Sequence, residues 1–328
     1  MAFGTTIAFV VLAGDVLVSC RAADRAAAPI VVERDPHQSV DAPHAHPPVE
    51  VFGDPIVTRL PVPARDPRRV VIDSAQRVLI ADAAAGKVLR VSSSGMVETL
   101  AADLDEPAGL ALDSQGRLYA AIRAGGRPRA GSVIRIDAAD STTTVLDGLS
   151  APTAIAFDAD DVLHVAVAGD ESILRVASPG GPTVVARGIE SPSALAHHRG
   201  AWHVASATKG TITRIDADGR ATIVAEGFMS LSDLAIGPEG ELIACDEADT
   251  LLAAVGPDGQ RKPFLPVPAG TRAIAFDGDG NLVAASGQLR IVVRLTTRLS
   301  VPCPHCDQRI PLRIRPRRPQ PDTEPDPI

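Results

Sequence analysis

The fold is decided by the stretch Glu106-Pro-Ala-Gly-Leu-Ala-Leu-Asp-Ser-Gln-Gly-Arg-Leu-Tyr-Ala-Ala121. Two short apolar runs, at 108–112 and 117–121, stand on either side of Asp113-Ser-Gln-Gly116. An aspartate can hydrogen-bond to its own backbone in a turn, and glycine adopts positive φ at no steric cost. The stretch therefore predicts two short antiparallel strands joined by a tight reversal.

This hairpin pattern occurs six times along the chain. Aligned on the residue that opens the turn, the copies form one column: Asp73, Asp113, Asp158, His198, Gly237 and Asp277. The intervals are 40, 45, 40, 39 and 40 residues, and the longest contains the loop insertion Arg123-Ala-Gly-Gly-Arg-Pro-Arg-Ala-Gly131. A period near 40 residues, built from short strands, is typical of the blades of a β-propeller.

Each copy is expected to hold four strands, except that the sixth lacks a fourth strand after residue 295. The segment at 55–61, Pro-Ile-Val-Thr-Arg-Leu-Pro, precedes the first copy and has the character of the missing strand. An unpaired seam would leave backbone donors and acceptors exposed. We therefore predict that 55–61 pairs with 291–295 and closes an all-β, six-bladed propeller over residues 54–298.

Composition narrows the range of partners. The chain has 328 residues, of which 45% are apolar and only 3% aromatic, so Val, Leu, Ile and Ala must fill the core. The net charge is −8 and the arginines of the repeats are scattered, whereas phosphate binding needs a concentrated basic face. Nucleic acid is therefore excluded as the main partner. The sequence contains no uninterrupted run of about 20 apolar residues, so it does not predict an ordinary membrane-spanning helix.

Residues 4–20 resemble the short apolar core of a signal peptide. They end in Leu17-Val-Ser-Cys20, which resembles a bacterial lipobox, the motif whose cysteine carries lipid. No Lys or Arg precedes the run and Asp15 lies inside it, so an N-terminal extension without this role is the alternative. We predict a lipoprotein signal peptide at 1–20, lipidation of Cys20 and a Pro-, Ala- and His-rich linker at 21–53.

These features predict an extracytoplasmic protein of the bacterial envelope. Its contact with the membrane would be the lipid on Cys20. A cytoplasmic protein is the alternative.

The repeat reads Pro-x-x-Leu-Ala-x-Asp-x-x-Gly-x-Leu-Tyr-Val-Ala followed by Ile-x-Arg-Ile, and it resembles the NHL-type six-bladed propeller. Relatives of that type include the gluconolactonase and regucalcin group, strictosidine-synthase-like proteins and peptidyl-hydroxyglycine lyases. The resemblance covers roughly residues 54–298. It implies a fold that serves both as an enzyme and as a binding platform.

In such propellers the innermost strands line a channel, and sites form where these strands begin. Most residues at these positions are small here, and the charged ones are Arg68, Arg69, Asp233 and Arg272. We predict Arg69, Asp233 and Arg272 as ligand-binding residues. A metal-dependent gluconolactonase would need converging Glu, Asn and Asp ligands. These positions hold one carboxylate, and the single asparagine, Asn281, lies on a turn, so that metal site is not expected.

The lyase relatives imply zinc bound by histidines from different blades. His164 and His203 share a column with Tyr119 and Leu79, so we interpret both as packing residues between blades. His197 replaces an apolar residue in an innermost strand and is the best histidine candidate for facing the channel.

The C-terminal segment 299–328 contains Cys303-Pro-His-Cys306. This spacing puts two thiolates on one turn, as in a zinc knuckle, but zinc takes four ligands and the chain has no second Cys pair. Three interpretations stay open: a disulfide or no function, zinc completed by a partner chain or by histidines, and a redox pair. Redox activity needs a helix N-terminus to lower a thiol pKa, and the Pro-rich tail does not predict one.

Two functions follow from the sequence. The first is a non-catalytic platform, tethered to a membrane, that binds a protein or a small ligand at the propeller face and needs no cofactor. The alternative is a divalent-metal-dependent lactone hydrolase or lyase with its site at the channel mouth. Its candidate catalytic residues are His197, Asp233 and Asp246, although aspartates at the position of Asp246 usually bond loop backbone.

Overall fold

The structure is a computed structural model that describes residues 55–138, 141–177 and 181–302, together with strand segments at 7–12, 15–20, 49–52 and 309–315. The chain divides into a large unit, Thr58–Arg294, and a second unit formed by its two ends, Met1–Val57 and Leu295–Ile328. Within the described part of the chain, no helix is long and apolar enough to cross a membrane.

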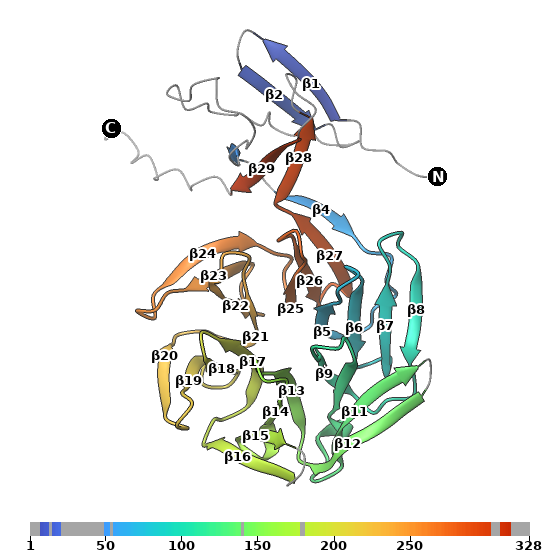
Figure 1. Ribbon diagram of the computed structural model, residues 1–328, viewed down its shortest axis with the longest axis vertical. Helices are drawn as coiled ribbons and strands as arrows, with labels where there is room; N and C mark the ends of the chain where they lie inside the picture. Colours follow the sequence, from blue (N-terminus) through green and yellow to red (C-terminus); the bar gives the residue numbers. More distant parts are fainter. Residues whose placement is uncertain are drawn as a thin grey trace, which may run out of the picture. The chain divides into compact units, whose positions relative to one another are not determined.

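The large unit is built from six four-stranded sheets arranged around a common centre (Figure 1). The innermost strands, one for each blade in order, are β5 (Pro67–Ile72), β9 (Pro107–Leu112), β13 (Pro152–Phe157), β17 (Pro192–His198), β21 (Leu231–Ile236) and β25 (Thr271–Phe276). Each of them contacts the innermost strands of both neighbouring blades. The repeat therefore forms a closed ring, and the predicted six-bladed propeller is confirmed.

The other strands follow outward in each sheet. The second strands are β6 (Val78–Asp82), β10 (Leu118–Ile122), β14 (Leu163–Val167), β18 (Ala201–Ser206), β22 (Leu242–Asp246) and β26 (Leu282–Ser286). The third strands are β7 (Lys87–Val91), β11 (Gly131–Ala138), β15 (Ser172–Ala177), β19 (Thr211–Ile215), β23 (Leu251–Val255) and β27 (Ile291–Thr296). The outermost strands of blades 1 to 5 are β8 (Val97–Ala101), β12 (Ser141–Leu149), β16 (Gly181–Arg187), β20 (Ala221–Ala225) and β24 (Arg261–Pro266).

The outermost strand of blade 6 comes from the other end of the repeat region. It is β4 (Ile56–Arg59), which lies next to β27 in the order β25-β26-β27-β4 (Figure 1). Directly after β4, the N–H of Leu60 donates to the backbone oxygen of Val292 at 2.8 Å. The predicted closing strand is confirmed, and the blade 6 sheet has no free edge at β27.

The second unit contains two small sheets. One pairs β1 (Ile7–Leu12) with β2 (Asp15–Cys20), and the other has the order β28 (Arg298–Pro302), β29 (Arg309–Arg315) and β3 (Val49–Phe52).

The turn aspartates act as the sequence predicts. Oδ1 of Asp113 accepts the backbone N–H groups of Gln115 at 3.0 Å and of Arg117 at 2.8 Å. Oδ2 accepts hydrogen bonds from the side chains of Arg117 and Tyr119. Gly116, in the same turn, has a φ of +75°. Burial raises the pKa of Asp113, but the hydrogen bonds from Arg117 and Tyr119 outweigh it and hold this pKa below its ordinary value.

The core lies between neighbouring blades and contains few aromatic rings. Its largest fully buried side chains are Ile, Leu and Val, for example Ile80 in blade 1, Ile212 in blade 4 and Leu282 in blade 6. Small residues such as Ala120 and Ala205 let the sheets approach. Burying one such Leu, Ile or Val side chain stabilises the fold by roughly 1.5–3 kcal/mol.

The hairpin turn yields a stability prediction. Asp113→Ala removes a buried acceptor of two N–H groups and should lower the free energy of unfolding by about 2 kcal/mol. The matched control is Asp218→Ala, because Asp218 is exposed and accepts only the N–H of Arg220, at 3.2 Å. Urea unfolding of both variants is the measurement. Equal decreases in the free energy of unfolding of the two variants would show that the buried turn aspartate contributes no more than an exposed one.

Candidate functional site

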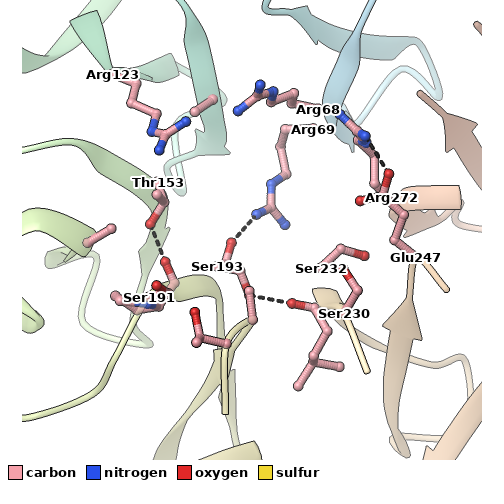
Figure 2. Close-up of a pocket in the computed structure, with 16 residues that line it drawn as sticks. Arg68, Arg69, Arg123, Thr153, Ser191, Ser193, Ser230, Ser232, Glu247 and Arg272 are labelled. Atoms are coloured by element: carbon pink, nitrogen blue, oxygen red, sulfur yellow. Dashed lines mark hydrogen bonds and ion pairs between the residues drawn. The ribbon is translucent and has the colours of Figure 1, made fainter. Parts of the chain in front are cut away.

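A cavity opens where the innermost strands begin and the second strands end. The two strands of a hairpin run in opposite directions, so these ends share one side of the ring. They line a cavity of about 390 Å³, here called the channel mouth (Figure 2). Its polar lining consists of Arg68, Arg69, Arg123, Arg272, Glu247, Thr153, Ser191, Ser193, Thr208, Ser230 and Ser232.

The side chain of Arg69 crosses the mouth. From β5 it donates one hydrogen bond to Oδ1 of Asp233 on β21, and a second, of 3.0 Å, to the backbone oxygen of Ser193 on β17. These partners lie 164 and 124 positions away in the sequence. Arg69 therefore joins blades 1, 4 and 5. The residue itself is only 9% exposed.

Asp233 is fully buried beneath the mouth. Besides Arg69, its Oδ1 accepts the N–H of Leu234 at 2.8 Å, and its Oδ2 accepts the N–H of Ile274 on β25 at 2.9 Å. Burial raises the pKa of Asp233 above its ordinary value, against the opposing effect of Arg69 and the two N–H groups. Protein donors thus already occupy both carboxylate oxygens.

Six charged side chains of alternating sign follow one side of the mouth over blades 2, 1, 6 and 5. We call this series the charged arc, and its members are Arg123, Glu106, Arg68, Asp66, Arg272 and Glu247. Each acidic member between two arginines contacts both of them. Oε1 of Glu106 accepts a hydrogen bond from Arg123 at 3.0 Å and forms an ion pair with Arg68, also at 3.0 Å. Asp66 accepts from Arg68 at 2.9 Å and from Arg272 at 2.6 Å.

These half-buried ion pairs add little to stability. Their effect is to hold the guanidiniums in fixed orientations. Arg272 also contacts Glu247 across the wall (Figure 2). Of the four carboxylates that pair with the mouth arginines, only Glu247 lines the cavity. The wall of the charged arc therefore presents mainly positive charge.

The opposite side of the mouth, over blades 3, 4 and 5, carries hydroxyl groups. Thr153 donates to the backbone oxygen of Pro192 in the next blade, and Ser193 donates to that of Leu231 at 2.7 Å. Each hydroxyl thereby ties its blade to the following one (Figure 2). The mouth has a charged half and a hydroxyl half.

Gly287, which follows β26, makes room for Arg272. A Cβ atom at this position would lie 2.5 Å from Cζ of Arg272 and 2.6 Å from its Nε. A side chain at this position would require the guanidinium of Arg272 to shift from its observed place.

The donor set of the mouth does not fit a divalent cation. Hard cations take several free oxygen ligands, whereas Oδ1 of Asp233 already accepts from Arg69 and Leu234, and its Oδ2 accepts from Ile274. Among the described residues, no group of three or more His, Cys, Asp or Glu side chains could hold a metal. Nearby Cys245 is buried, and burial raises the pKa of its thiol, so it stays protonated.

The histidine candidates lie away from the mouth. His197 is near the end of β17 opposite to Ser193, with its ring 5.0 Å from that of Trp202. His164 packs on the same Trp202 at 4.4 Å and bonds the backbone oxygen of Val162. His203 is buried 5.7 Å from the ring of His198.

Asp246 braces a loop. It accepts the backbone N–H groups of Met229 at 2.7 Å, Ser230 at 2.9 Å and Ala248 at 3.1 Å. Asp82 does the same in blade 1 for Arg65 and Asp66. This is the backbone role that the sequence analysis gives for an aspartate at the position of Asp246.

Three candidates fall wholly or partly outside the described residues. Cys303 and Cys306 lie outside them, and so does most of the linker at 21–53. Cys20 ends strand β2, but its side chain is not among those described. Lipidation of Cys20 and zinc at the Cys pair stay predictions.

The structure brings Arg69, Asp233 and Arg272 together, and it adds residues that the sequence analysis does not select. Arg123 and Glu247 each follow a second strand directly, in a column completed by small residues: Ala83, Ala168, Ala207 and Gly287. Because that strand ends where its neighbour begins, this column faces the mouth as well. The two charged residues in this column of small residues were the sequence signal that could have identified Arg123 and Glu247 as part of the mouth.

Solved structures share the fold. A gluconolactonase from Xanthomonas campestris matches with a TM-score of 0.65 and 19% identity, over 75% of this chain and 90% of that chain. A catalytically inactive virginiamycin B lyase from Staphylococcus aureus, with quinupristin, matches with a TM-score of 0.55 and 16% identity, over 89% and 94%. A chain of the nidogen/laminin complex matches with a TM-score of 0.58 and 17% identity, over 67% and 89%.

No protein-family model matches the sequence, and no curated protein matches it. At these identities the structural matches show the fold. They bear out the resemblance to gluconolactonase-like and NHL-type six-bladed propellers. The chemistry of the mouth has to be inferred from its own residues.

Buried His203 predicts acid sensitivity. Burial, with nearby His198 and Arg214, lowers the pKa of His203 from 6.5 to about 4. The unfolded chain therefore binds the proton between these pH values, and stability falls as the pH drops through this window, by up to about 3 kcal/mol.

The variant His203→Leu should lose part of this pH dependence, since Leu79 fills the same column in blade 1. Urea unfolding at pH 7 and pH 4.5 measures it. An unchanged pH dependence in the variant would contradict a neutral, buried imidazole.

Proposed function

We propose that the channel mouth binds a small, polyhydroxylated carboxylate, or the lactone of such an acid. The observation that carries this proposal is the division of the mouth. Arg68, Arg123 and Arg272 of the charged arc lie on one side, and Thr153, Ser193 and the neighbouring hydroxyls lie on the other. A ligand with a carboxylate at one end and hydroxyls along its length matches both halves.

The arginines suit a carboxylate because guanidiniums present several N–H donors in a fixed plane. Asp66 and Glu106 take only part of the donors of each arginine and orient the remainder. Pre-oriented groups lose little freedom when a ligand arrives, and this raises affinity. The cavity volume of about 390 Å³ suits a ligand of monosaccharide size.

Binding alone accounts for the contacts of the mouth, whereas the structural neighbours favour the enzyme alternative over a non-catalytic platform. The X. campestris gluconolactonase among the structural neighbours favours, as the second candidate, hydrolysis of a lactone at the same mouth. Glu247 is the cavity-lining carboxylate for this role, and Arg272 is its contact.

Such a hydrolysis would use Glu247 as general base. Water attacks the lactone carbonyl while Glu247 takes its proton, and a guanidinium of Arg272 or Arg68 stabilises the oxyanion. The ring C–O bond then breaks, the leaving oxygen receives the proton, and a hydroxy acid forms. The product would be the same kind of carboxylate that the mouth is suited to bind.

Attachment to a membrane through Cys20 is a further part of this proposal. It rests on the Leu17-Val-Ser-Cys20 motif and the linker composition. Mass spectrometry of the mature N-terminus in a bacterial host tests it, and an unmodified, unprocessed Met1 would exclude it.

Gluconate is the probe for the binding proposal. Wild-type protein should bind gluconate more tightly than the neutral polyol sorbitol, with an affinity that falls as salt is raised. Arg272→Gln should weaken gluconate binding about tenfold, since it removes one charge-assisted pair. Isothermal titration calorimetry measures both.

The control for that experiment is Arg175→Gln, an exposed arginine on β15 outside the mouth. It should bind gluconate like the wild type. Equal binding of gluconate and sorbitol, or equal losses in the two variants, would refute a carboxylate site at the mouth.

Hydrolysis has its own test. If the second candidate function holds, the wild type hydrolyses glucono-1,5-lactone above the spontaneous rate, and Glu247→Gln slows turnover about 100-fold, as expected for loss of a general base. A pH-stat assay with Arg175→Gln as control measures this. Wild-type turnover equal to the spontaneous rate would leave binding as the function.

A further inference from the structure

We propose that Arg69 is the resident cation of the channel. In this view its guanidinium neutralises the buried carboxylate of Asp233 beneath the mouth, a task that a divalent metal would otherwise perform. The mouth then needs no metal for binding. This role does not depend on the identity of the ligand, or on whether a reaction follows.

The first argument is the electrostatics of Asp233. It is fully buried, and an uncompensated carboxylate in such a place costs several kcal/mol. The N–H groups of Leu234 and Ile274 supply dipoles, but Arg69 supplies the full opposite charge in direct contact. The ion pair is therefore required once Asp233 is buried and ionised.

The second argument is the pair of oxygens that Arg69 contacts. One belongs to the carboxylate of Asp233 and the other is the backbone carbonyl of Ser193. Carboxylate and carbonyl oxygens are the ligands that hard divalent cations prefer. One guanidinium spans both, so the oxygens that could begin a metal site are already engaged.

The third argument is space. Arg69 belongs to a column at the starts of the innermost strands whose other members, apart from Asp233, are small: Gly109, Ala154, Ala194 and Ala273. At Gly109 even a methyl group would lie 3.1 Å from Cβ of Ala121 and 3.2 Å from Cα of Ala154. The small members of this column leave space that the side chain of Arg69 enters (Figure 2).

A guanidinium differs from a metal in its consequences. It stays protonated throughout the physiological pH range, and a chelator cannot remove it. Arg69 lines the cavity with its remaining exposed surface, so a bound anion would meet its charge directly. By pairing with Asp233, Arg69 keeps this carboxylate from attracting a cation, and the arginines of the charged arc are left to attract an anion.

The test uses the full chain carrying Cys303→Ala and Cys306→Ala, so that the C-terminal pair cannot bind metal. The probe is Mn²⁺, followed by electron paramagnetic resonance and by thermal unfolding. The protein with Arg69 should bind no stoichiometric Mn²⁺, and EDTA should shift its Tm by less than about 1 °C. Stoichiometric Mn²⁺ that is lost on Asp233→Asn would overturn the proposal.

Removal of the cation gives the converse test. Arg69→Ala leaves Asp233 unpaired and should lower Tm by about 10 °C. Mn²⁺ at millimolar concentration should restore part of the loss. In Arg69→Ala/Asp233→Asn the buried charge is gone, so Tm should exceed that of the single variant and should not respond to Mn²⁺.

If Arg69→Ala is too unstable to purify, the double variant carries the test by folding where the single variant does not. An Arg69→Ala protein as stable as its parent would refute the proposal, as would a double variant less stable than the single one. Gluconate affinity before and after EDTA should agree within twofold. A complete lack of gluconate binding would count against the proposed ligand only, because the Mn²⁺ and Tm results judge Arg69 separately.

Discussion

The pairing of strand β4 with blade 6 is the interaction on which the rest of the structure depends. Strand β4 lies beside β27, and directly after it the N–H of Leu60 donates to Val292. Sheets built from a local repeat can stack into an open array as readily as into a circle. This junction supplies the missing outer strand of blade 6, and with it the first and sixth copies become neighbours like any other two.

Closure matters for function because it brings the starts of all six innermost strands together. Asp66 and Arg272 are separated by 206 positions, yet they form an ion pair of the charged arc. Arg69 reaches Asp233 over 164 positions. An open array would separate these partners, and the guanidiniums would lose the carboxylates that orient them. Ring closure is thus also the device that pre-organises the mouth.

The same scaffold serves different chemistry in its structural neighbours, which include a gluconolactonase, a virginiamycin B lyase and a chain of the nidogen/laminin complex. A few columns of residues at the strand ends decide what each mouth can do, while the blades only hold them in place. In this chain one such column reads Arg69, Gly109, Ala154, Ala194, Asp233 and Ala273. Its single cation and single anion neutralise each other, and the surrounding arginines are left to face the solvent and a ligand.

The sequence by itself determined the fold, the number of blades and the closing strand. These features were predictable because the repeat is local: turn aspartates such as Asp113 bond their own hairpins, and the alternation of apolar residues sets each strand. It also singled out Arg69, Asp233 and Arg272 by their charge among small neighbours. Only the tertiary structure decided that Arg69 reaches across to Asp233 and that Asp66 pairs with Arg272. Those facts depend on how far side chains reach between blades, and contacts between residues more than 100 positions apart leave no periodic trace in the sequence.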